Sequence, residues 1–206
     1  KTVGYILDHS DAKVLIVDRQ FHDVVVNALE QVNRDIVVID IDDQQAGLEN
    51  SRSIGDLEYE SFLETGDRDF EWIRPNDEWQ AIGLSYTSGT TGKPKGVVYH
   101  HRGSYLMSMG SVTAWNMPNK LTYLYTVPMF HCNGWGYPWT LAMLHAKIIF
   151  IRNIVVKEIF QLISQYKVTH FGGAPIVLNM IANAPQEEQL AIPNKVYVMT
   201  AGAPPP

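Results

Sequence analysis

The sequence predicts an α/β protein built from layered, mostly parallel sheets with helices on both faces. Two observations lead to this fold class. Short apolar, β-branched runs alternate along the chain with segments whose apolar residues recur at helical spacing. Several of the strand-like runs end in acidic or glycine-rich turns, as the strands of strand–helix–strand units do.

One strand–helix–strand unit opens the chain. Residues 13–17 form a predicted buried strand that ends at Asp18, and residues 21–32 place their apolar side chains on one helical stripe. The run 36–39 is a second predicted strand, closed by an acidic turn at 40–43. The crossover between the two strands should be right-handed.

The stretch 43–78 is polar and acidic, and it is interpreted as a connector with weak helical character only at 58–64. Beyond it, strands and helices alternate again. The predicted strands are 81–86, 96–99, 121–127, 147–151, 168–171 and 195–200, and the predicted helices are 102–114, 138–145, 155–166 and 175–184.

Composition limits the class of protein. The chain has 206 residues, 46% of them hydrophobic, which is enough for a buried core and too apolar for a disordered chain. A single cysteine excludes a disulfide framework and any multi-thiolate metal site. Residues 1–80 carry a net charge of −12 and residues 81–206 a net charge of +6. The basic part suits an anionic small molecule, and the acidic part argues against nucleic acid as a partner.

Neither a membrane span nor a targeting signal is recognisable. The apolar runs are all shorter than the roughly 18 residues that a span requires, and no signal segment opens the sequence. With one thiol and no export signal, the cytoplasm is the expected compartment. The sequence starts at Lys1 without an initiator methionine and stops in a triple proline, so a fragment of a longer protein is expected.

The most informative stretch is the loop 86–96, Tyr-Thr-Ser-Gly-Thr-Thr-Gly-Lys-Pro-Lys-Gly. Its glycines let backbone N–H groups approach an anion, while its Ser and Thr hydroxyls and its two lysines supply further donors and positive charge. It matches neither the Walker pattern nor the G-x-G-x-x-G dinucleotide pattern. The loop therefore favours a polyphosphate ligand, and the alternative is a flexible Thr-rich hairpin loop with solvated lysines.

The same loop resembles the signature loop of the adenylate-forming (AMP-binding) superfamily. Residues 128–135, Pro-Met-Phe-His-Cys-Asn-Gly-Trp, resemble the acid-pocket motif of fatty-acyl-CoA synthetases. Residues 200–204, Thr-Ala-Gly-Ala-Pro, resemble the loop that lies against the adenine ring, and residues 1–42 look like the family's N-terminal region. The resemblance covers essentially the whole chain and implies the N-terminal-domain portion of an acyl-CoA synthetase.

What the resemblance implies is an ATP-dependent acyl-CoA ligase of fatty acid metabolism, with ATP, Mg²⁺ and CoA as ligands. Such an enzyme activates a fatty, medium-chain or short-chain carboxylic acid as acyl-AMP and transfers it to CoA, while Mg²⁺ bridges phosphate oxygens. The residues implied to bind the ATP phosphates are Thr87, Ser88, Gly89, Thr90, Thr91, Gly92, Lys93, Pro94 and Lys95. Those implied to contact adenine are Gly202, Ala203 and Pro204, and those implied to line the acyl pocket are His131, Asn133, Gly134 and Trp135.

His131 is also the implied catalytic residue, through a hydrogen bond to the charge that develops near the α-phosphate. The alternative is an ordinary core or surface histidine, and Gly134-Trp135 could equally be plain packing. No residue is assigned to a metal. The Gly-Gly-Ala-Pro run at 172–175 is explained by the start of a helix and receives no role.

The implied organisation is a single incomplete domain. Residues 1–80 form its acidic α/β segment and connector, and residues 81–206 form its phosphate-loop, acyl-pocket and adenine-loop segment. The family's Tyr-Gly-x-Thr-Glu motif and its lysine-bearing C-terminal domain are absent from these residues, so this part alone should be inactive. Two other functions stay open: an adenylation domain that loads an amino or aryl acid onto a carrier protein, and a non-catalytic nucleotide-binding homologue. A homodimer is compatible with the sequence.

Overall fold

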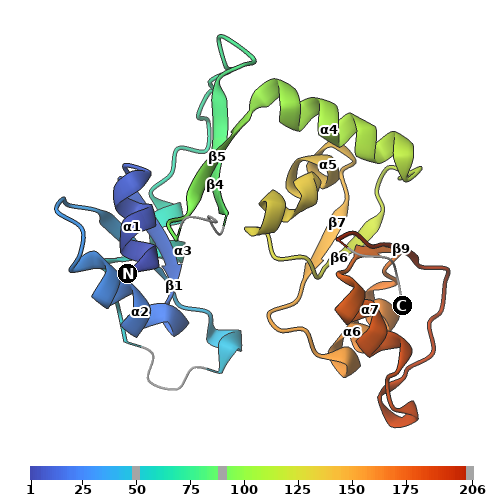
Figure 1. Cartoon of the computed structure of the whole chain (residues 1–206). Helices are drawn as coiled ribbons and strands as arrows, with labels where there is room; N and C mark the ends of the chain where they lie inside the picture. The colour runs from blue at the N-terminus through green and yellow to red at the C-terminus, as the bar shows by residue number, and fades with distance from the viewer. Residues whose placement is uncertain (48–51, 88–91, 203–206) are drawn as a thin grey trace. The chain divides into compact units, whose positions relative to one another are not determined.

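The structure is a computed structural model that describes residues 1–47, 52–87 and 92–202 (Figure 1). The chain forms two compact units, residues 1–98 and residues 99–206. Each unit has its own parallel sheet.

The first unit begins with a helix and continues as a strand–helix–strand arrangement. Its helices and strands are α1 (Thr2–His9), β1 (Val14–Asp18), α2 (His22–Leu29), β2 (Val37–Ile41), β3 (Leu57–Glu58), α3 (Tyr59–Glu64), β4 (Ala81–Thr87) and β5 (Lys95–His100), whose last residues belong to the second unit, with short 3-10 helices at Arg19–Phe21 and Gln44–Ala46. Strands β1, β2 and β3 form one parallel sheet in that order, and β4 pairs with β5. Because α2 returns the chain to the starting edge, β1 and β2 run in the same direction, with Val14 opposite Val37.

Helices α1 and α2 pack against one another, and Leu7 of α1 and Ala28 of α2 are buried. Burial along β1 alternates as expected for a strand with one covered face. Val17 is buried, whereas Val14 and Ile16 are about half exposed.

The acidic turn predicted at 40–43 is wrong in one respect, because β2 runs on through Ile41 and buries Asp40 completely. The Asp40 carboxylate accepts hydrogen bonds from the Ser53 hydroxyl (2.6 Å) and from the backbone N–H groups of Ile54 (2.9 Å) and Gly55 (3.2 Å). It also lies 3.3 Å from Nε of Arg19. These partners compensate the buried charge of the Asp40 carboxylate.

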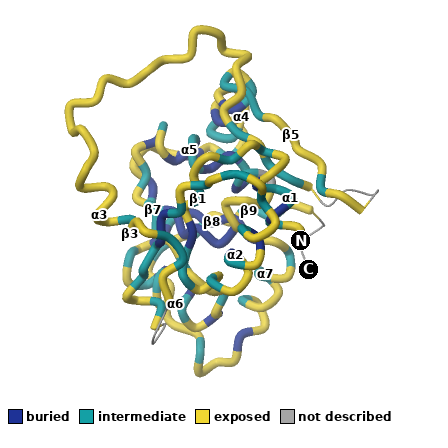
Figure 2. Tube along the Cα trace, turned by 90° about the vertical axis from the view of Figure 1, so that its left-hand side faces the viewer, coloured by how far each residue is buried: buried dark blue, intermediate teal, exposed yellow. Residues whose placement is uncertain are grey.

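The stretch interpreted as a connector contains β3 and α3, and α3 lies within the weakly helical stretch predicted at 58–64. Beyond α3, residues 65–80 are exposed throughout (Figure 2). The connector thus contributes one short strand to the sheet and then leaves the folded core of the first unit.

The second unit is built around a four-stranded sheet in the order β7-β6-β8-β9, with all three pairs parallel. Its helices and strands are α4 (His101–Ala114), β6 (Thr122–Tyr125), α5 (Tyr137–Met143), β7 (Lys147–Phe150), α6 (Val156–Tyr166), β8 (His170–Gly172), α7 (Pro175–Ala182) and β9 (Tyr197–Met199), with 3-10 helices at His131–Gly136 and Gln186–Glu188. Strand β6 is central: Leu124 pairs with Ile149 of β7 on one side and with Phe171 of β8 on the other.

Helices cover both faces of this sheet, as the sequence predicts. Tyr123 and Tyr125 of β6 belong to a buried cluster with residues of α4 and α5, whereas the intervening Leu124 packs with residues of α6 and α7. The first cluster consists of Met117, Leu121, Tyr123, Tyr125, Tyr137, Leu141 and Leu144, and the second of Leu124, Ile159, Ile163, Val168 and Phe171. Among the helices of the described residues, none is long and apolar enough to cross a bilayer.

Candidate functional site

Three segments of the second unit follow the carboxyl ends of neighbouring parallel strands. Residues 128–136 come after β6, residues 173–175 after β8, and residues 200–202 after β9. Because parallel strands end at the same edge of their sheet, these segments gather at one edge, where α/β proteins bind ligands. The predicted acyl-pocket and adenine segments are therefore brought to the same edge of one sheet.

The acyl-pocket segment is held in an uncommon backbone conformation. Asn133, Gly134, Trp135 and Gly136 all have positive φ, from 45° to 71°. For a bulky side chain such as Trp135 this region costs roughly 1–3 kcal/mol and persists only where the surroundings enforce it. The Tyr125 hydroxyl enforces it in part by donating a 3.1 Å hydrogen bond to the Gly134 carbonyl oxygen.

Glycine is favoured at two positions of this segment, because Gly134 and Gly136 have φ of 60° and 71°. At Gly134 a Cβ would also clash with the Tyr125 hydroxyl of β6, whereas at Gly136 it would meet the flexible end of the Met107 side chain. The left-handed backbone therefore explains both glycines, and the close approach of β6 adds a second reason at Gly134.

Trp135 lies against Gly172, the last residue of β8, which begins the Gly-Gly-Ala-Pro run that received no predicted role. A Cβ on Gly172 would lie 3.2 Å from ring atom Cζ3 of Trp135 and 3.0 Å from the Tyr123 hydroxyl oxygen. Thr126 donates a hydrogen bond to the Gly172 carbonyl oxygen. The Gly-Gly-Ala-Pro run does begin α7, with Pro175 as its first residue, but Gly172 also makes room for Trp135. A glycine at the end of a buried strand was the available signal.

His131 begins the 3-10 helix, and its side chain is exposed. Its backbone N–H donates a 3.0 Å hydrogen bond to the carbonyl oxygen of Pro128, which closes the turn after β6. Asn133 is half-buried. His131 thus presents an exposed imidazole after the carboxyl end of β6, and its catalytic role stays a prediction.

The tyrosines packed against this segment are neutral. Burial raises the pKa of Tyr125 to about 12. Burial, followed by the neighbouring tyrosines, raises the pKa of Tyr123 and of Tyr137 still further. The Tyr137 hydroxyl lies 2.6 Å from Sδ of Met199, which ties α5 to the end of β9. These side chains therefore support the segment and carry no charge at physiological pH.

The predicted adenine segment begins directly after β9. The backbone N–H of Gly173 donates a 2.9 Å hydrogen bond to the carbonyl oxygen of Met199, which links the ends of β8 and β9. Gly202 is exposed, with φ of 93°. Ala203 and Pro204 lie outside the described residues.

The predicted phosphate loop belongs to the first unit and connects β4 to β5. Thr87 is the last residue of β4, Gly92 has φ of 90°, and Lys95 is the first residue of β5. Lys93 and Lys95 are both exposed. Of the other predicted phosphate-binding residues, Pro94 is half-buried, and Ser88, Gly89, Thr90 and Thr91 lie outside the described residues.

The loop's donor set fits phosphate oxygens rather than a metal ion. Residues 87–95 contain hydroxyls, lysines and backbone N–H groups, and no carboxylate. Among the described residues of the chain, no group of three or more His, Cys, Asp or Glu side chains could hold a metal ion.

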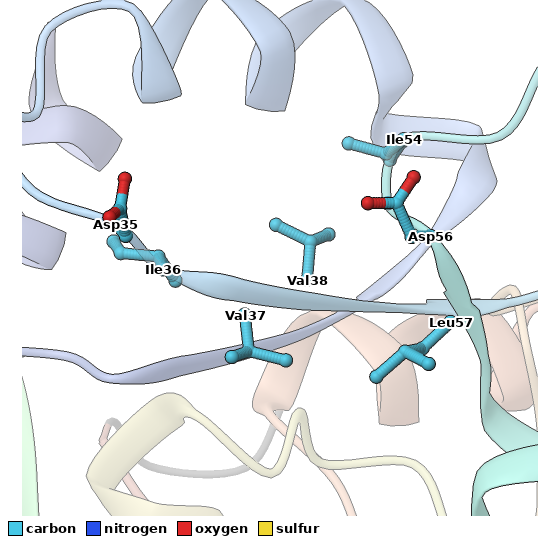
Figure 3. A pocket seen from close by; sticks show the side chains of 8 residues that line it. Asp35, Ile36, Val37, Val38, Ile54, Asp56 and Leu57 are labelled. Carbon is cyan, nitrogen blue, oxygen red and sulfur yellow. The ribbon is translucent and has the colours of Figure 1, made fainter.

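Two pockets of the first unit lie away from all the predicted residues. One, of about 390 Å³, is flanked by Asp35 and Asp56, with Val38 and Ile54 on its side of β2, while Val37 points to the other side (Figure 3). The other, of about 320 Å³, is lined by residues 41–45 and 58–60. Sequence motifs predict no chemistry for either pocket.

The fold and the predicted site residues together define a class: an α/β protein with predicted binding segments after the carboxyl ends of parallel strands and a Gly/Thr/Lys loop between two further strands. Residues 1–206 match the family model of the AMP-binding enzymes, and the chain belongs to that family. The predicted membership in the adenylate-forming superfamily is thereby confirmed.

Curated relatives place the chain on the acyl-CoA synthetase branch. The peroxisomal acetate/butyrate–CoA ligase AAE7 of Arabidopsis thaliana is 46% identical over 216 residues, covering 100% of this chain and 38% of the relative. The acetate–CoA ligase CCL3 of Humulus lupulus is 44% identical, again over 100% of this chain and 38% of the relative. The chain therefore spans well under half the length of these relatives.

Solved structures show the same fold at low identity. The N-terminal domain of FACL13 from Mycobacterium tuberculosis has a TM-score of 0.75 at 22% identity, covering 100% of this chain and 48% of that one. A red-emitting luciferase from Phrixothrix hirtus has a TM-score of 0.77 at 19% identity, covering 98% of this chain and 39% of the luciferase chain. These likenesses confirm the predicted α/β architecture of an acyl-CoA synthetase N-terminal domain.

Proposed function

We propose that the chain is part of an ATP-dependent acyl-CoA ligase that converts a short-chain carboxylic acid to its CoA thioester. Membership of the whole chain in the AMP-binding enzyme family is the observation that carries the proposal. The names of three relatives, an acetate/butyrate–CoA ligase, an acetate–CoA ligase and a 2-methylpropanoate–CoA ligase, support a short acid and favour CoA over a carrier protein as acceptor.

In the proposed reaction the acid carboxylate attacks the α-phosphate of ATP, pyrophosphate leaves, and the CoA thiol then displaces AMP from the acyl-adenylate. Phosphoryl chemistry of this kind is largely positioning and charge neutralisation. The hydroxyls and lysines between Thr87 and Lys95 would bind the β- and γ-phosphates and stabilise the leaving pyrophosphate. When Mg²⁺ is bound with ATP, it offsets charge on the same oxygens.

The remaining contacts are those that the family resemblance implies. Gly202 and the two residues after it would meet adenine through backbone and small side chains. Trp135 and Gly134 would form a wall of the acyl pocket, and Asn133 would add a polar side chain. The exposed imidazole of His131 would donate a hydrogen bond to the charge developing between the carboxylate and the α-phosphate.

Lys95→Ala in the full-length protein tests the phosphate assignment. Loss of a charge-assisted contact should raise the KM for ATP on the order of 10-fold or more, with the KM for acetate or butyrate nearly unchanged. Lys13→Ala is the matched control, because Lys13 is an exposed lysine of the first unit that pairs with Asp11 outside the loop. Acid-dependent ATP–pyrophosphate exchange measures both constants. An unchanged ATP KM and kcat in Lys95→Ala would reject the assignment.

The cytoplasm is the proposed compartment, because a single cysteine suits a reducing environment. The Arabidopsis relative carries the word peroxisomal in its name, which makes the peroxisome the competing compartment. Cell fractionation of the full-length protein, with marker enzymes for both compartments, decides between them.

A further inference from the structure

Helix α1 contacts the residue at which the phosphate loop begins. Nδ1 of His9 lies 2.7 Å from the hydroxyl oxygen of Tyr86, a distance at which the two groups share a hydrogen bond. Their rings also meet edge to face, with centroids 5.7 Å apart. Tyr86 lies in β4 directly before Thr87, so this contact fixes the strand end from which the loop departs.

The same helix contacts the returning end of the loop. The Tyr5 hydroxyl donates a 3.4 Å hydrogen bond to the carbonyl oxygen of Pro94, and Nζ of Lys93 lies 5.6 Å from the centre of the Tyr5 ring, within cation–π range. A Cβ on Gly96 would lie 3.8 Å from Cε1 of His9. Two side chains of one helix thus contact both described ends of the loop.

The sequence of α1 explains how it can do this. Tyr5 and His9 are four residues apart and therefore share a helix face, where their ring centroids are 5.3 Å apart. Gly4 and Leu7 are buried, and a Cβ on Gly4 would lie 3.0 Å from the Ala28 carbonyl oxygen of α2. Because α2 fixes one side of the helix, the Tyr5–His9 face is held toward the loop.

We propose that α1 positions the phosphate loop, with His9 and Tyr5 as positioning residues for ATP. This proposal rests on the proposed function, in which the loop binds the phosphates of ATP. Binding an anion costs a glycine-rich segment backbone entropy, and contacts that already hold residues 86 and 93–94 reduce that cost. The two side chains do not touch the reacting atoms and act through the geometry of residues 86 and 93–94.

Hydrogen exchange tests the positioning without any ligand. In His9→Ala, the backbone amides of residues 84–99 should exchange about 3- to 10-fold faster than in the unsubstituted full-length protein, as expected for the loss of one hydrogen bond. His22→Ala is the matched control, because His22 lies on α2 of the same unit and its Nδ1 pairs with Asp23. Exchange in His9→Ala equal to that in His22→Ala would overturn the proposal.

Kinetics separate positioning from general destabilisation. His9→Ala and Tyr86→Phe should each raise the KM for ATP about 3- to 10-fold and leave the KM for the acid unchanged, and the double variant should be no worse than either single one. His9→Asn should restore much of the ATP affinity, because its amide reaches the place of Nδ1. Equal rises in both KM values, or fully additive effects of the two substitutions, would overturn the proposal.

Comparing His9→Ala with Lys95→Ala tests this proposal and the proposed function separately. If exchange rises in His9→Ala while Lys95→Ala leaves the KM for ATP unchanged, α1 holds the loop but the loop does not bind phosphate. If Lys95→Ala raises the KM for ATP and His9→Ala does not, the phosphate assignment holds and positioning by α1 is rejected.

Discussion

At the scale of single residues, Asp40 shows how a buried charge can be hidden in an acidic stretch of sequence. It lies among neighbouring acidic residues that are partly exposed, and only the folded chain supplies its partners from residues 53–55 and Arg19. Burial disfavours the charged carboxylate, but the hydrogen bonds from Ser53, Ile54 and Gly55 and from Arg19 outweigh it. They hold the pKa of Asp40 below its ordinary value of 3.8.

Asp40→Asn should lower the free energy of unfolding by about 1–3 kcal/mol at neutral pH, because an amide cannot accept from all these donors. The folded pKa is depressed, so the stabilisation is complete above pH 3.8 and is lost as the pH falls through the folded value. Urea denaturation between pH 7 and pH 2, on the unsubstituted chain and the variant, measures the difference.

Asp35→Asn is the control for this series, because Asp35 is an exposed carboxylate just before the same strand. It should change the free energy of unfolding by no more than about 0.5 kcal/mol. If the difference in the free energy of unfolding between the unsubstituted chain and Asp40→Asn stayed constant down to pH 2, the link between the low pKa of Asp40 and stability would be contradicted.

The family resemblance singled out His131, Trp135 and Gly202, and the structure places them after strands that end at one edge of the sheet. Their roles stay predictions. The approach of Trp135 to Gly172 was not predictable, because it depends on the non-local pairing of β6 with β8 and on the left-handed backbone before α5. Tyr5 and His9 carry no motif, and only their contacts single them out.

At the scale of elements, hydrophobic periodicity predicted helices and strands well where they are long or buried. Helix α6 is predicted at 155–166 and observed at Val156–Tyr166. Helix α1 was not predicted separately, because its eight residues carry only two buried positions. The strand predicted at 121–127 shortens to β6, since pairing with β7 and β8 ends at Tyr125, before the turn at Pro128.

The end of α6 offers an element-scale test. Lys167 ends the helix with φ of 52°, a conformation that costs a residue with a Cβ about 1 kcal/mol or more and costs glycine almost nothing. Lys167→Gly should therefore raise the Tm by roughly 2–4 °C, measured by circular dichroism. Gln161→Gly, in the exposed middle of the same helix, should lower the stability by about 1 kcal/mol. A lower Tm for Lys167→Gly would show that the lysine side chain contributes more to stability than its left-handed backbone costs.

At the scale of the whole molecule, the chain is a family member that spans about 38% of its curated relatives. A reaction that depends on positioning needs all its contacts at the same time. Residues 1–206 do not contain the Tyr-Gly-x-Thr-Glu motif or the lysine-bearing C-terminal domain that the family resemblance implies. A polypeptide of these 206 residues alone should therefore give no acid-dependent ATP–pyrophosphate exchange, while the full-length protein, as control, should. Exchange by the short polypeptide above the protein-free background would refute this prediction.

The central place of β6 has a consequence for how the protein is made. The strand leaves the ribosome before β7, β8 and β9, and its partner β8 begins only at His170, about 45 residues later. At roughly 5–20 residues per second, the edge of β6 that pairs with β8 stays unpaired for on the order of 2–9 s. We expect nascent chains to be accessible to chaperones, and to misassembly with one another, during that interval.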